Sequence, residues 1–165
     1  MRIGFLIIDM QKIFLQDQVE KKTVDQACEY INYVAYSLRS NGHLVVHIQD
    51  IEGMDNQEAN IDLYNFISEI QIDEGDAVIK KEYSNAFWKT DLEQLLQNHE
   101  VELVIISGFA AEHCVLFTYN GAIERGFKPV ILQKGILSTH FDAITSTYRD
   151  RNLISYPVID SLVSN

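Results

Sequence analysis

Three side chains in this sequence of 165 residues could together activate a nucleophile. Asp9, Lys81 and Cys114 each stand at, or shortly beyond, the end of an apolar segment. A thiolate is the reactive form of cysteine, and a nearby ammonium or a helix N-terminus favours that anion. A carboxylate can take the thiol proton as a general base. The three residue types therefore form a complete set for nucleophilic catalysis, provided that the fold brings them together.

Apolar strands and amphipathic helices alternate along the chain, and this alternation predicts a parallel sheet covered by helices on both faces. We expect strands at 2–9, 43–50, 76–81, 101–107, 128–133 and 152–158. We expect helices at 23–42, 61–70, 90–99, 112–125 and 140–151, with capping boxes at Thr23/Gln26 and Thr90/Glu93. Ligands of such sheets bind beyond the carboxyl ends of the strands. The three candidate residues are therefore expected to meet there.

The turn that leads into the helix of Cys114 has a second relevant feature. Ala110 and Ala111 have no side-chain oxygen that could cap the first amides of this helix. These amides and that of Cys114 can instead hold the oxyanion that develops on an attacked carbonyl. Water is the alternative occupant.

Composition excludes several other classes of protein. The net charge of −11 and the scattered Lys and Arg residues disfavour nucleic-acid binding. No apolar run approaches the length of a membrane span, and the short N-terminal run that ends at Asp9 reads as a strand. We expect a single cytoplasmic domain over residues 1–165. Cys28 and Cys114 form neither a disulfide framework nor a zinc motif, and Cys28 lies on the apolar stripe of a predicted helix.

Three segments, in order along the chain, resemble the isochorismatase-like cysteine hydrolases. "FLIIDMQKIF" is similar to their opening D-x-Q-x-x-F motif, and "VIKKEYSNAFWKTDLEQLL" to their lysine segment. "IISGFAAEHCVLFTYNGAIERGF" resembles their nucleophile segment. Each motif is weak alone, but the three together are specific and cover most of the chain.

The resemblance implies a three-layer α/β/α sandwich with a six-stranded, mostly parallel, doubly wound sheet. It also implies that Asp9 is the acid and base, Lys81 the catalytic lysine and Cys114 the nucleophile. Lys80 is adjacent, but side chains alternate along a strand, so only one of the two lysines can face the site. A cis peptide before the nucleophile helix is implied too, and we expect it between Ala110 and Ala111.

Departures from particular subfamilies narrow the expected reaction. Nicotinamidases of this family carry a metal beside the pocket, with an Asp-x-His pair after strand two. Asp50 matches that aspartate but the histidines are missing, so we expect no metal or other cofactor. True isochorismatases cleave a vinyl ether without this cysteine. Cys114 therefore favours hydrolysis of a C–N bond in a small amide or carbamoyl compound, through a thioester.

Several residues beside the motifs are candidates for substrate contacts: Gln11, Phe14, Tyr83, Trp88 and Phe117. Core or subunit packing is the alternative for each of the aromatic residues. A redox-active thiol and a non-enzymatic binding protein remain alternative functions. A nucleotide-binding protein is disfavoured, because no glycine fingerprint follows the first strand. The resemblance also implies a homo-oligomer.

Overall fold

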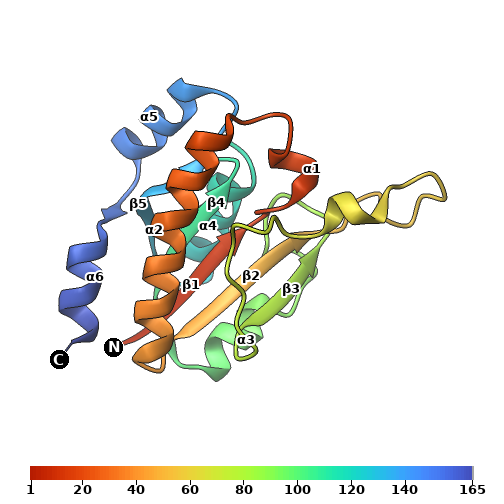
Figure 1. Cartoon of the computed structure of the whole chain (residues 1–165). Helices are drawn as coiled ribbons and strands as arrows, with labels where there is room; N and C mark the ends of the chain where they lie inside the picture. The colour runs from red at the N-terminus through yellow and green to blue at the C-terminus, as the bar shows by residue number, and fades with distance from the viewer. Residues whose placement is uncertain (165) are drawn as a thin grey trace.

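The computed structural model describes residues 1–164 and contains one six-stranded sheet (Figure 1). The strand order is β3-β2-β1-β4-β5-β6, and every neighbouring pair is parallel. The strands are β1 (Arg2–Ile8), β2 (Leu44–Asp50), β3 (Ala77–Lys81), β4 (Val101–Phe109), β5 (Lys128–Leu137) and β6 (Leu153–Ile154). The predicted doubly wound fold is confirmed.

Helices cover both faces of the sheet, and a separate apolar core lies on each face. α2 (Lys21–Ser40) and α6 (Tyr156–Val163) form one outer layer, and α3 (Leu92–Asn98) and α4 (Cys114–Glu124) form the other (Figure 1). Alternation along β1 supplies both cores, because Phe5 points to the α2 side and Leu6 to the α4 side. The remaining elements are α1 (Lys12–Leu15), the 3-10 helix η1 (Ile61–Tyr64) and α5 (Phe141–Asp150).

Several predicted boundaries differ from those observed. The segment predicted as a strand at 152–158 keeps strand pairing only at Leu153–Ile154 and then enters α6. Pro157 explains the change, since proline has no N–H for a sheet and suits the first turn of a helix. The predicted capping box at Thr23 is also wrong, because α2 already begins at Lys21. The helix expected at 61–70 is only the single 3-10 turn η1.

Gly108 pairs with Ile8 near the ends of β4 and β1, where its backbone leaves no room for a side chain. Gly108 has a φ of +107°, and a Cβ atom there would lie 2.0 Å from the carbonyl oxygen of Ile8. Only glycine accepts both that conformation and that contact. This pairing places the turn that leads into α4 beside Asp9, the residue that follows Ile8.

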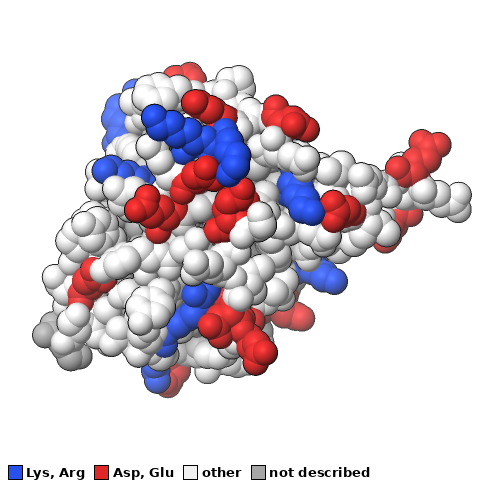
Figure 2. Space-filling model, viewed as in Figure 1, with Lys and Arg blue, Asp and Glu red and all other residues white. Residues whose placement is uncertain are grey.

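Basic side chains on the face drawn in Figure 2 lie beside acidic ones. Lys12 pairs with Asp62, and Lys21 pairs with both Asp25 and Glu69. Among residues 1–164, no helix is both long and apolar enough to cross a bilayer.

Candidate active site

The site begins with Asp9, which immediately follows β1. Its φ of +50° is a conformation that aspartate tolerates better than most residues, and its amide donates to the carbonyl of Ile48 on β2 at 3.0 Å. The side chain is 1% exposed. Within residues 1–164, no backbone amide or hydroxyl donates to its carboxylate, and the groups beside it are the Lys81 ammonium and the Cys114 thiol. A buried carboxylate with so few donors is costly, and such a group is a candidate for proton transfer.

Lys81 ends β3 and points into the same space. Its side chain is fully buried whereas Lys80 is exposed, so the alternation of the strand places Lys81 at the site. The Nζ atom lies 2.9 Å from Oδ2 of Asp9 and 2.7 Å from Oδ2 of Asp50. It also lies 3.5 Å from Sγ of Cys114. Lys81 thus contacts each of the other three side chains of the site.

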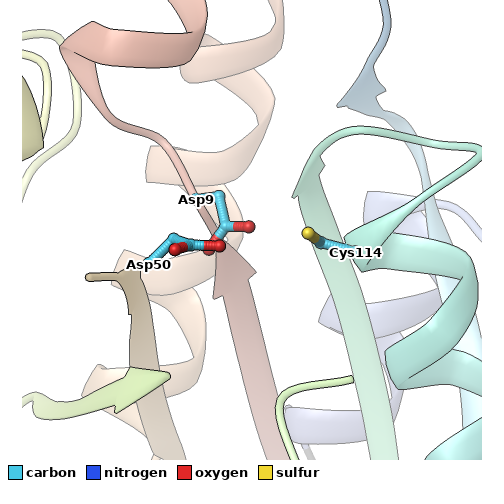
Figure 3. Close-up of side chains that lie close together, drawn as sticks. All are labelled: Asp9, Asp50 and Cys114. Atoms are coloured by element: carbon cyan, nitrogen blue, oxygen red, sulfur yellow. The ribbon is translucent and has the colours of Figure 1, made fainter. Parts of the chain in front are cut away.

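Cys114 is the first residue of α4, and its half-buried thiol faces the two carboxylates (Figure 3). The sulfur and the carboxylate oxygens of Asp9 and Asp50 lie within 4.8 Å of one another. The sequence prediction that Asp9, Lys81 and Cys114 meet is therefore realised in the geometry. Cys28, by contrast, lies on the buried face of α2, where burial raises the pKa of its thiol to about 12.

Burial and the neighbouring charges together set the protonation states of Asp9, Cys114 and Lys81. Burial raises the pKa of Asp9 to about 6, against the opposing influence of Lys81. Burial also raises the pKa of the Cys114 thiol to about 12, and the negative charge of Asp9 adds to that rise. Burial disfavours the Lys81 ammonium, but Asp9, Cys114 and Asp50 outweigh it and raise its pKa above the ordinary value. The resting site therefore holds a thiol, a carboxylate and an ammonium at neutral pH.

This resting state differs from the thiolate that a lysine and a helix N-terminus alone would favour. The buried carboxylate of Asp9 opposes a second negative charge at Cys114. Proton transfer from the thiol to Asp9 must then accompany attack on a substrate.

The turn before α4 corrects part of the expected oxyanion site. The amide of Ala111 donates to the carbonyl of Leu137 at 2.9 Å, so it is not free to bind an oxyanion. Among the described residues, the amides of Ala110 and Cys114 have no acceptor. The cis peptide bond lies between Phe109 and Ala110, one residue earlier than expected.

Gln11 has a structural role in place of the expected contact with substrate. Its buried side chain donates to the carbonyls of Asp50 and Tyr64, at 2.9 and 2.7 Å, and accepts from the amide of Asp50 at 2.8 Å. This clamp ties the end of β1 to the end of β2. It occupies both polar atoms of the side chain.

The aromatic candidates for substrate contacts divide into two groups. Phe14 packs on the core and stacks on Phe109 with 5.7 Å between ring centroids. Tyr83, Trp88 and Phe117 are each between 42% and 52% exposed and keep their rings open to solvent. These three remain candidates.

Asp50 is the member of the site that sequence reasoning treated only as a remnant of a metal centre. Asp9, Asp50 and Cys114 present three donor atoms, but the Lys81 ammonium lies within contact of all three. The sequence after Asp50, "IEGMDNQ", supplies no histidine. The residues present therefore do not fit an Asp-x-His metal centre. The pairing of β2 with β3, which places Asp50 opposite Lys81, could not be read from the sequence.

Comparison with known proteins places this chain in a family. Residues 4–154 match the family model of the isochorismatase domain. An N-carbamoylsarcosine amidase from Arthrobacter sp is 36% identical over 63 residues, which is 38% of this chain and 24% of that protein. The isochorismatase family protein YrdC of Bacillus subtilis is 26% identical over 150 residues, or 89% of this chain and 80% of that protein.

Solved structures agree on the fold. The N-carbamoylsarcosine amidase of Thermoplasma acidophilum superposes with a TM-score of 0.79 at 21% identity, covering 94% of this chain and 95% of that one. An isochorismatase family protein of Desulfovibrio vulgaris gives 0.86 at 16% identity, covering 99% and 98%. The chain that carries Asp9, Lys81 and Cys114 at adjoining strand ends belongs to the isochorismatase family.

Proposed function

We propose that this protein is a cysteine hydrolase that cleaves the C–N bond of a small amide or carbamoyl compound through a thioester on Cys114. The observation that carries the proposal is the contact of Lys81 with both Asp9 and Cys114, where within residues 1–164 no backbone amide or hydroxyl donates to the Asp9 carboxylate. Amidases among the matched relatives support the class of reaction.

The reaction would proceed in two halves. Asp9 takes the proton of the thiol while Sγ of Cys114 forms a bond to the carbonyl carbon, and Lys81 stabilises the sulfur as its charge develops. The amides of Ala110 and Cys114 hold the oxyanion. The C–N bond then breaks, and Asp9 returns its proton to the nitrogen of the leaving amine.

Water completes the cycle. It attacks the thioester carbonyl while Asp9 takes one of its protons. The C–S bond breaks, and the sulfur regains that proton from Asp9. The net reaction converts one amide and one water into one acid and one amine, with the protein unchanged.

A redox-sensing thiol fits the geometry less well. Such cysteines have a low pKa and are accessible. Burial and Asp9 instead raise the pKa of Cys114, and the other cysteine of the chain, Cys28, lies in the core beneath α2.

Substrate identity and assembly are open to direct measurement. Ammonia release from nicotinamide, maleamate, N-carbamoylsarcosine and simple primary amides tests the proposal, with Cys114→Ala as the matched variant. We expect release by the wild type from at least one compound and none by the variant, whose fold circular dichroism would show to be intact. Equal release by both proteins, or none by the wild type from any compound, would overturn the proposal.

We also expect a homo-oligomer, which light scattering would show.

A further inference from the structure

The Lys81 ammonium is shared between two carboxylates. Asp50 accepts a hydrogen bond from Nζ at 2.7 Å, and Oδ2 of Asp9 forms an ion pair with the same atom at 2.9 Å. The side chains of Lys81 and Asp50 are 0% and 11% exposed, so water screens this pair little. The ammonium is therefore paired with a second carboxylate, Asp50, besides the one that serves as the base.

Asp50 is itself fixed from several directions. Gln11 binds both its amide and its carbonyl, and its Oδ1 accepts from the amide of Glu52 at 2.9 Å. Strand pairing sets Asp50 directly opposite Lys81. Only Oδ2 is left for the ammonium, so the geometry of the pair is determined by the fold.

The charges around Asp9 indicate what the Asp50–Lys81 pair contributes to the site. Asp9 follows β1 and faces Asp50 from β2, Lys81 from β3 and Cys114 from α4. With Asp50 ionised, the Asp50–Lys81 pair is neutral. Asp9 and Cys114 then have a single proton between them beside a neutral pair, and in the resting site the thiol holds it.

We propose that Asp50 is a positioning residue that neutralises and orients the Lys81 ammonium, so that the proton shared by Asp9 and Cys114 can move in both directions during turnover. The inference rests on the proposed function, because it assigns Asp50 a part in that reaction. Asp50 acts through Lys81 and needs no contact with the substrate.

Removal of the Asp50 charge should have two opposite effects. Without the charge of Asp50, the Lys81 ammonium acts on Asp9 and Cys114 alone, so it favours both the thiolate of Cys114 and the carboxylate of Asp9 more strongly. The thiol then loses its proton more easily, while Asp9 becomes a poorer acid toward the leaving amine. Alkylation of the thiol should speed up and hydrolysis of amides should slow down. A purely structural role would impair both reactions.

Asp50→Asn is the test, because asparagine keeps an acceptor for the Glu52 amide and removes the charge. Glu52→Gln is the matched control, since this neighbouring carboxylate is exposed and does not contact Lys81. Iodoacetamide is the probe, and peptide mass spectrometry follows the modification of Cys114 from about pH 6 to about pH 10. If Asp50→Asn does not fold, Asp50→Ser retains an acceptor for the same amide.

We expect Asp50→Asn to alkylate about tenfold faster at a given pH below the thiol pKa, which corresponds to a shift of about one pH unit. Its amide hydrolysis should fall by about tenfold or more, because general acid catalysis contributes at least that much. Glu52→Gln should match the wild type in both assays. Unchanged alkylation, or alkylation and hydrolysis that fall together, would overturn the inference.

The alkylation assay and the hydrolysis assay together distinguish a failure of this inference from a failure of the proposed function. Faster alkylation of Asp50→Asn in a protein whose wild type hydrolyses none of the tested amides would support the role of Asp50 at the thiol and contradict the hydrolase. Hydrolysis by the wild type with alkylation unaffected in Asp50→Asn would support the hydrolase and contradict the role of Asp50.

Discussion

The carboxylate of Asp9 faces the thiol of Cys114, and an oxygen of Asp9 lies within 4.8 Å of Sγ (Figure 3). Within residues 1–164 no backbone amide or hydroxyl donates to either oxygen of Asp9. The ammonium of Lys81 contacts both partners. Proton transfer from sulfur to oxygen is therefore the simplest chemistry that this geometry supports.

The first prediction concerns the pH dependence of catalysis. Asp9 must be ionised to take the thiol proton, and burial raises its pKa to about 6. A plot of kcat/KM against pH should therefore fall on the acidic side of about pH 6. In Asp9→Asn the residual rate should be lower by roughly 100-fold or more and should lack this acidic limb. An acidic limb of unchanged position in Asp9→Asn would show that another group is the base.

The same carboxyl group predicts a dependence of stability on pH. Because the pKa of folded Asp9 is raised from 3.8 to about 6, the folded state holds this proton more tightly than the unfolded chain. Its contribution to stability is complete below the unfolded pKa and is lost as the pH rises through the folded one. Relative to Asp9→Asn, the free energy of unfolding of the wild type should fall by about 3 kcal/mol across this interval.

Urea denaturation of both proteins at a series of pH values measures this difference. His47, whose pKa is lowered by burial, produces an opposite trend in both proteins, and that trend cancels in the comparison. A difference that stays constant, or that grows with pH, would contradict the raised pKa of Asp9.

Gly108 provides a test of how the fold delivers Cys114 to Asp9. Gly108→Ala would place a methyl group against the carbonyl of Ile8 and should destabilise the protein by about 4 kcal/mol or more, or prevent folding. Gly126→Ala is the matched control, because Gly126 also has a positive φ but nothing lies within 4 Å of its Cβ position. It should cost only about 1 kcal/mol. Similar losses in the two variants would remove the steric explanation.

A buried polar cluster on the α2 side makes a separate prediction. Asp76 accepts two hydrogen bonds from Arg39, at 2.7 and 2.6 Å, and lies 3.0 Å from Nε2 of the buried His47. Asp76→Asn would leave Arg39 without its charge partner and should cost about 3 kcal/mol, the low end of the range because Arg39 is partly exposed. Chemical denaturation measures this, with the exposed pair of Lys12 and Asp62 as the reference.

In that reference pair, Asp62→Asn should change stability by less than about 1 kcal/mol. A cost for Asp76→Asn as small as that for Asp62→Asn would mean that the buried cluster adds nothing to folding.

The sequence was sufficient to predict which residues meet because the rules of parallel sheets are general. Asp9, Lys81 and Cys114 stand near the ends of three strands, and such ends share one edge of the sheet. Alternation of side chains allowed only one of Lys80 and Lys81 to face the site, and the resemblance to the family's lysine segment favoured Lys81, which is the buried one of the two. Topology and the three motifs together carried these predictions.

Features that depend on register or on a single hydrogen bond were not predicted. The partnership of Asp50 with Lys81 requires the pairing of β2 with β3, and the clamp by Gln11 requires the ends of β1 and β2 to be level. The capture of the Ala111 amide by Leu137 depends on where β5 ends. None of these leaves a periodic pattern in the sequence.

The central claim is that Cys114 carries the acyl group during hydrolysis. The most direct measurement is peptide mass spectrometry of the protein after rapid acid quenching, during turnover of an amide from which it releases ammonia. The account predicts an added mass equal to the acyl group on the peptide that contains Cys114, and neither adduct nor turnover in Cys114→Ala. Turnover that proceeds with Cys114 unmodified and persists in Cys114→Ala would contradict it.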